Sequence, residues 1–144
     1  MKNRKKTVAI WILMVVSAAL MPMDMEAQRG WGRNSPYCNL YTTGEVTMYS
    51  GEVVEIGHFY PENGASYGVE LTVRTTKGLV VIHLGPNRYM ERQRIQFTIG
   101  DEIKVLGALV DFDGRSVVMA REVEKGNEKL SLRDKMGRPV WRRW

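Results

Sequence analysis

The fold is decided by the stretch Gly78-Leu-Val-Val-Ile-His-Leu-Gly-Pro86. Its central residues are apolar except for His83, and glycine or Gly-Pro bounds the run on each side. A short apolar run between such residues is typical of a β-strand that is covered on both faces. Alternation of side chains places Val80, Ile82 and Leu84 on one face and Leu79, Val81 and His83 on the other. We expect the all-apolar face to contact the main core and Pro86 to end the strand.

The segments on both sides of this stretch alternate between apolar and polar residues and are separated by turn residues. Before it, the pattern predicts a long strand over 45–56 with a bend at Ser50-Gly51, a loop over 57–68 and a strand over 69–74. After it, the pattern predicts a short helix within 87–96, strands over 103–109 and 116–123, and a short edge strand over 130–132. Tight turns are predicted at Thr75–Gly78 and Asp111–Gly114.

This order of elements predicts an all-β fold, namely a small five-stranded OB-fold-like Greek-key barrel with one short helix between strands 3 and 4. We expect the barrel to span residues 43–126. Residues 28–42 are rich in Gly, Arg, Asn and Ser and lack any periodicity, so they are predicted to form a flexible lead-in. Residues 127–144 are predicted to form a C-terminal extension that packs on the barrel.

Residues 1–27 have the pattern of a signal peptide. A basic start is followed by the apolar stretch Thr7–Leu20, which is too short for the roughly 20 residues of a membrane span. Cleavage after Ala27 would place the protein in the periplasm or outside the cell, and the alternative is an uncleaved anchor. The formal net charge is +5, and part of it belongs to this segment, so charge alone does not indicate nucleic-acid binding. Cys38 is the only cysteine, which excludes an internal disulfide.

Several short motifs carry a family resemblance. They are Tyr67-Gly-Val69, Val81-Ile-His-Leu-Gly-Pro86, Gly100-Asp101, Ala120-Arg-Glu-Val123, Leu130-Ser-Leu-Arg-Asp134 and Gly137-Arg-Pro-Val-Trp141. Together they resemble a family of small exported bacterial OB-fold proteins that includes the domain of the magnetosome-associated proteins S and X. The resemblance spans about residues 43–141, and Arg88 stands where the family usually has an aromatic residue. It implies an OB-fold and carries no assigned reaction.

OB-folds bind ligands on the face of strands 2 and 3 and on the adjoining loops. The residues that fall there are Phe59, Tyr60, Tyr67, Arg74, His83 and Phe112. Such a set could stack on flat rings or sugars, although the aromatic residues could instead cap the barrel ends. We therefore expect a binding module for a protein, a glycan or a small ligand, and no cofactor. The chain has no nucleophile motif, phosphate loop or paired histidines, so we do not expect an enzyme.

Three other functions stay open. Scattered arginines on an OB-fold suggest single-stranded nucleic acid, but Asp111 and Asp113 would repel phosphate, which argues against nucleic acid as a partner. A metal- or redox-linked accessory role would need Cys38, His58 and His83 to meet as ligands. The basic aromatic end of the chain could touch a membrane surface through Trp141, Arg142, Arg143 and Trp144, while the simpler alternative is that Trp141 packs on the barrel.

Overall fold

The computed structural model describes residues 29–141. Their strands are β1 (Glu45–Phe59), β2 (Gly68–Thr75), β3 (Gly78–Pro86), β4 (Glu102–Phe112), β5 (Arg115–Lys125) and β6 (Glu128–Ser131). Their helices are α2 (Pro36–Asn39), the 3-10 helix η1 (Leu40–Thr43) and α3 (Asn87–Glu91). The deciding stretch is therefore a strand with the predicted limits, and the one helix after it is shorter than the predicted range.

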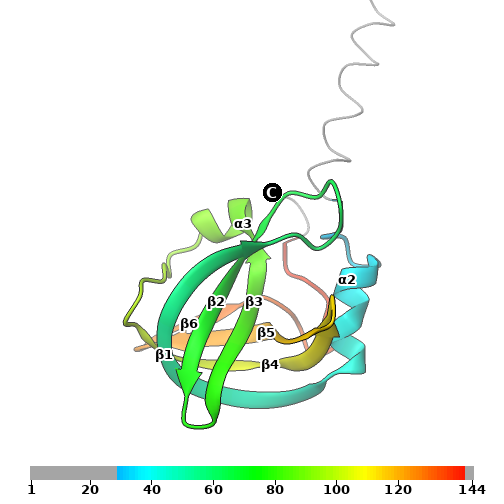
Figure 1. The fold of residues 1–144 in the computed structure, drawn as a ribbon. Helices are drawn as coiled ribbons and strands as arrows, with labels where there is room; N and C mark the ends of the chain where they lie inside the picture. Colours follow the sequence, from blue (N-terminus) through cyan, green and yellow to red (C-terminus); the bar gives the residue numbers. More distant parts are fainter. Residues whose placement is uncertain (1–28, 142–144) are drawn as a thin grey trace, which may run out of the picture.

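The strands form a closed ring (Figure 1). Their order is β3-β2-β1-β4-β5-β6, with antiparallel neighbours, and a parallel pairing of β3 with β5 closes the ring. β6 pairs only with β5 and lies outside the ring. α3 follows β3 and leads to β4, which is the place predicted for the helix. The predicted OB-fold-like barrel is confirmed.

β1 serves both halves of the barrel because it bends in its middle. Its first half pairs with β4 and its second half with β2, and Glu52 has a partner on each side. A Cβ atom at Gly51 would overlap the carbonyl oxygen of Arg74, so glycine is required where the two strands come close. The predicted bend is therefore present. The strand runs on to Phe59, three residues beyond the predicted end, so the following loop is shorter than predicted.

The buried residues form two layers, one inside the barrel and one outside it. β3 contributes to both, because Ile82 and Leu84 lie on one of its faces and His83 lies on the other, and all are fully buried. Leu79, at the start of β3, is exposed. The histidine face is covered by aromatic side chains from segments that precede and follow the barrel. These are Trp31, Tyr37 and Trp141.

The prediction of a flexible lead-in is wrong for residues 29–42. Pro36 starts α2, and the Ser35 side chain caps it by accepting a hydrogen bond from the Cys38 amide. Trp31 fits over Gly68, where a Cβ atom would lie 2.5 Å from its ring. The segment is ordered because its aromatic side chains bury apolar area against the barrel, which a search for local periodicity does not detect.

The C-terminal extension packs on the barrel as predicted. Arg133 is buried, and its Nη1 donates hydrogen bonds to the carbonyl oxygens of Leu84 on β3 and Ala120 on β5. The parallel pairing of these two strands covers only two residue pairs, so Arg133 bridges them where their own pairing ends. The Trp141 ring lies over the guanidinium, with its centroid 4.9 Å from Cζ.

The ends of the chain bear on two further predictions. The predicted signal peptide lies wholly outside the described residues, as do Arg142, Arg143 and Trp144. None of the helices within residues 29–141 is long and apolar enough to cross a bilayer.

Candidate ligand-binding site

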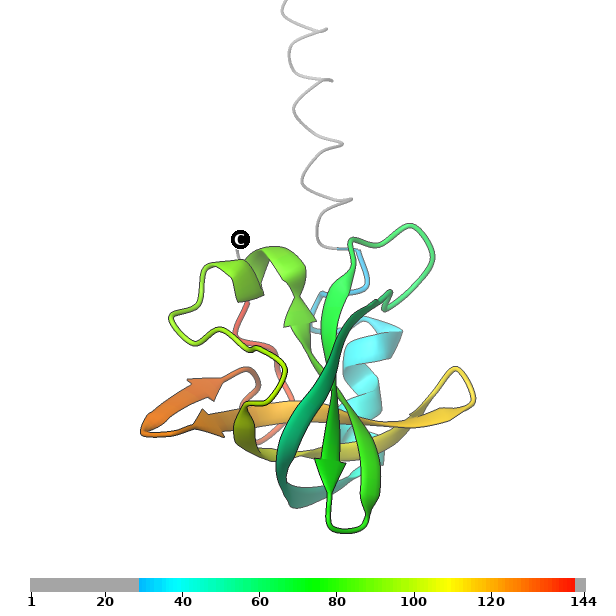
Figure 2. The same ribbon diagram turned by 60° about the vertical axis from the view of Figure 1, so that its left-hand side comes forward.

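A pocket of about 480 Å³ lies at the rim of the barrel, between the β1–β2 loop and the β4–β5 hairpin. Its lining residues are His58, Phe59, Tyr60, Pro61, Glu62, Asn63, Phe112, Asp113 and Arg115. Figures 1 and 2 show both connections reaching out on the side of the barrel where α2 lies. These connections flank the surface that OB-folds use for binding, so the pocket lies where the fold predicts a ligand.

The two walls of the pocket, which are the β4–β5 hairpin and the β1–β2 loop, are each fixed by the backbone geometry and hydrogen bonds of a turn. In the hairpin, Asp113 and Gly114 both have positive φ values, 50° and 78°, as a two-residue hairpin turn of type I′ requires. The Asp111 carboxylate accepts a hydrogen bond from the Gly114 amide and so fixes this turn. In the loop, the Ala65 amide bonds to the carbonyl of Glu62, at a distance of 3.2 Å. Both walls are therefore ordered by short-range hydrogen bonds.

The floor of the pocket is aromatic. The Phe59 ring stacks on the His83 imidazole, with a centroid separation of 3.6 Å and an interplanar angle of 9°. Phe112 meets the same imidazole edge-on at 5.2 Å. Tyr37 of α2 lies 5.5 Å from Phe59 and 5.4 Å from Phe112. The floor is therefore one packed cluster, and His83 lies at its centre.

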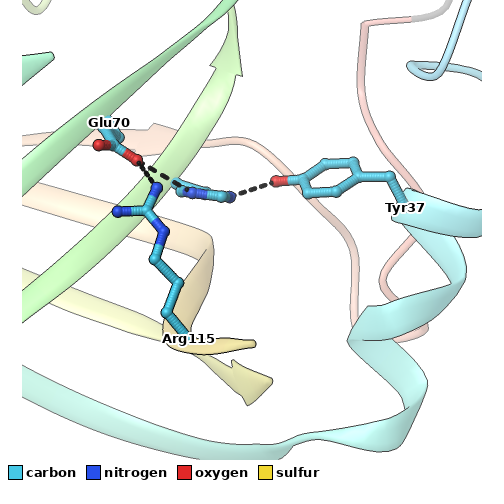
Figure 3. Close-up of polar contacts among 4 residues, drawn as sticks. Tyr37, Glu70 and Arg115 are labelled. Carbon is cyan, nitrogen blue, oxygen red and sulfur yellow. Dashed lines mark hydrogen bonds and ion pairs between the residues drawn. The ribbon is translucent and has the colours of Figure 1, made fainter. Parts of the chain in front are cut away.

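Both ring nitrogens of His83 are hydrogen-bonded (Figure 3). Nε2 lies 3.2 Å from a carboxylate oxygen of Glu70, and Nδ1 lies 3.0 Å from the hydroxyl of Tyr37. An ionised carboxylate can only accept, so Nε2 donates to Glu70 and Nδ1 of a neutral ring accepts from Tyr37. Burial lowers the pKa of His83 below its ordinary value, although the hydrogen bond and charge of Glu70 oppose this. Burial also raises the pKa of Tyr37, so its phenol stays protonated and donates.

Glu70 joins this buried pair to the pocket. The same carboxylate oxygen that accepts from His83 lies 2.9 Å from Nη2 of Arg115, which lines the pocket (Figure 3). Burial acts to raise the pKa of Glu70, but the hydrogen bond from His83 and the charge of Arg115 outweigh it and lower the pKa. Glu70 is therefore a carboxylate, and a chain of contacts runs from Arg115 at the pocket through Glu70 and His83 to Tyr37 on α2.

The model of the MamS/MamX magnetosome protein family matches residues 45–130, which is more than half of the chain. The chain belongs to this family. The match confirms the resemblance seen in the sequence motifs. It covers the ring of strands and most of β6, and it leaves out α2, η1 and the segment that carries Arg133 and Trp141.

One solved structure similar to this MamS/MamX protein is the N-terminal domain of the PriB protein from Thermoanaerobacter tencongensis, described as dimeric. The similarity covers 58% of this chain and 97% of that chain, with 18% sequence identity and a TM-score of 0.39. None of the curated proteins matches this chain.

The MamS/MamX domain brings most of the predicted binding residues to one place. Phe59, Tyr60 and Phe112 line the pocket, and His83 lies beneath its floor. Tyr67 stands beside them, because its ring centroid lies 6.5 Å from that of Tyr60. Phe59 and Phe112 are buried, so they shape the floor, whereas Tyr60 is 60% exposed and offers its ring to solvent.

Arg74 does not join this group. It lies near the far end of β2, six residues beyond Gly68, which is a distance of about 20 Å along a strand. Its guanidinium lies 3.8 Å from the carboxylate of Glu52 on β1. Arg74 therefore lies away from the pocket, because the end of β2 near Gly68 is the end that approaches it, and its role in binding stays a prediction.

The three candidate metal ligands are not brought together. Phe59 and His58 alternate on β1, so the exposed His58 faces away from the cluster that contains His83. Cys38 is buried, and its thiol lies 3.7 Å from the carbonyl oxygen of Trp31. Within residues 29–141, no group of three or more His, Cys, Asp or Glu residues is placed to hold a metal ion.

Three residues of the site were missed by sequence reasoning, namely Tyr37, Glu70 and Arg115. Glu70 could have been found, because it is the residue that pairs with His83 across β2 and β3. Arg115 begins β5 at the edge of a predicted hairpin turn, so it could also have been placed near the β1–β2 loop. Tyr37 had no such signal, since it comes from the segment predicted to be loose.

Trp141 is not available to a membrane. It is buried, and its indole N–H donates to the carbonyl oxygen of Trp31 at 3.1 Å. The alternative in which Trp141 packs on the barrel is therefore confirmed.

Proposed function

We propose that the protein is an exported, non-enzymatic binding module that holds its ligand in the pocket between the β1–β2 loop and the β4–β5 hairpin. The observation that carries this proposal is the pocket itself. It lies at the binding end of an OB-like barrel, it has a rigid aromatic floor, and the exposed Tyr60 stands at its rim. A preformed floor of this kind reduces the entropy that is lost when a ligand binds.

Binding rather than catalysis is supported by the contacts of two titratable groups beneath the pocket, His83 and Glu70. A general base must reach its substrate through a free nitrogen or oxygen. Both nitrogens of His83 are already bonded within the protein, and the imidazole is fully buried. The Glu70 oxygen that contacts His83 also holds Arg115. These groups support the shape of the pocket.

Export is supported by the sequence pattern of residues 1–27. Cell fractionation of the producing organism tests this part. The protein is expected in the periplasmic or secreted fraction, and recovery in the cytosol would contradict the proposal.

Hydrogen exchange tests the binding site. A soluble cell-envelope extract should slow amide exchange at residues 58–63 and 112–115, which form the pocket walls. Tyr60→Ala should remove this protection, whereas Leu79→Ala should keep it, because Leu79 is exposed at the opposite end of β3. Unchanged exchange at both walls, or equal protection in the two variants, would contradict the proposal.

A further inference from the structure

We infer that the pocket takes an uncharged glycan segment rather than a polyanion. This inference rests on the proposed function and names the class of ligand for the same pocket. OB-folds bind both oligosaccharides and oligonucleotides, so the fold leaves both open, and the side chains of the pocket must decide.

The aromatic rim suits a sugar ring. Tyr60 is exposed, and the centroid of Tyr67 lies 6.5 Å from it and 4.4 Å from that of His58. Tyr67 is also held in place, because its hydroxyl accepts a hydrogen bond from Asn87 at 2.9 Å. A pyranose ring has an apolar C–H face, which packs on the face of a fixed aromatic ring, and hydroxyl groups around its edge.

The polar side chains of the pocket suit those hydroxyl groups. Glu62, Asn63 and Asp113 line the pocket and are exposed. Carboxylates accept hydrogen bonds from hydroxyl groups, and an amide both accepts and donates. The lining therefore offers several acceptors and a donor around aromatic rings, which matches a ligand with many hydroxyl groups and no charge.

The charges of the pocket oppose a polyanion. Glu62 and Asp113 are acidic, and the one arginine in the lining, Arg115, is already paired with Glu70 at 2.9 Å. The nearby Arg29 lies 3.9 Å from Glu62. Barrels that bind single strands do so in a positively charged groove, where cations neutralise several phosphates. A phosphate in this pocket would instead meet arginines that already contact carboxylates, and it would face the carboxylate of Asp113.

The test uses the exported protein on an array of neutral and acidic oligosaccharides, with oligo(dT) and a peptide library measured beside it at low salt. At least one neutral oligosaccharide should bind. Its affinity should fall about tenfold in Tyr60→Ala, which corresponds to the loss of one aromatic contact, and should be unchanged in Leu79→Ala.

Each other outcome overturns the inference in a recognisable way. Binding only of acidic sugars, oligo(dT) or peptides, lost in Tyr60→Ala, overturns the ligand class and keeps the pocket. Neutral-sugar binding that Tyr60→Ala leaves unchanged overturns the site. Failure of every probe overturns the glycan inference, and the hydrogen-exchange experiment with the envelope extract then decides separately whether the pocket binds anything.

Discussion

Protonation of His83 should destabilise the protein, and the loss should begin near neutral pH. The imidazole is fully buried between Phe59 and Phe112, and burial lowers its pKa below the ordinary value of 6.5. In the unfolded chain the same group titrates near its ordinary value. Between the two pKa values the unfolded state binds a proton that the folded state does not.

This difference fixes both the sign and the size of the effect. The contribution of the neutral His83 to the free energy of unfolding is complete above pH 6.5 and is lost as the pH falls toward the folded pKa. When the unfolded state binds one proton more than the folded state, the free energy of unfolding falls with decreasing pH by an amount that approaches about 1.4 kcal/mol per pH unit. Glu70 also has a lowered pKa, so its contribution is lost only below its ordinary value of 4.5. The range between 6.5 and 4.5 therefore reports on His83.

Urea denaturation followed by tryptophan fluorescence, repeated between about pH 7.5 and pH 5, measures the slope. His83→Gln should flatten it, because an amide keeps one donor and one acceptor but does not titrate. His58→Gln is the matched control, since it removes the exposed histidine at the end of β1 and should keep the slope. A flat profile in the wild type would refute the argument, as would a slope that disappears with His58 and persists without His83.

Three further substitutions test the layer that covers His83. Gly68→Ala places a methyl group 2.5 Å from the Trp31 ring and should lower the free energy of unfolding by about 1–3 kcal/mol. The control Gly32→Ala adds a methyl group that meets nothing within 4 Å and should leave the melting temperature unchanged when thermal melts of the two variants are compared. Trp31→Ala should cost about 3–5 kcal/mol in urea denaturation, and a loss below about 1 kcal/mol would show that the segment does not pack as described. Glu70→Ala should lower the free energy of unfolding by about 1.5–3 kcal/mol in the same measurement, because it leaves a buried imidazole N–H without its charged acceptor. The control Glu52→Ala removes a carboxylate from a surface ion pair and should lower it by under about 1 kcal/mol.

The strands of the barrel could be predicted because their signals are local. The apolar run of β3, the alternation in β2 and the glycine in β1 each follow from the residues themselves. The ends of elements were less predictable, since β1 continues through His58 to Phe59 by pairing with β2, and α3 stops at Glu91 although the polar stretch continues. Pairing with β2, rather than composition, decided the end of β1.

The site was predictable to the extent that it depends on fold class. An OB-fold reading places Phe59, Tyr60 and Phe112 near one end of the barrel, and the structure confirms that they line one pocket. The same interpretation grouped Arg74 with these residues, but Arg74 lies at the other end of β2, because membership of strand 2 does not say which end of the strand a residue occupies. Placing Glu70 beside His83 requires the register between β2 and β3, which follows from the predicted tight turn at Thr75–Gly78.

The chemistry of His83 depends on segments that lie outside the matched family region. The region 45–130 supplies His83, Glu70 and the two phenylalanine rings, but the partner of Nδ1 is Tyr37, which precedes it. Trp31 packs against Tyr37, and Trp141 bonds to Trp31 from the other end of the chain. Without these flanking segments the histidine face of β3 would lie open to water, and burial, the first cause of the lowered pKa, would weaken. The barrel therefore positions the histidine, while the flanking aromatic residues keep it neutral and hold the floor of the pocket rigid.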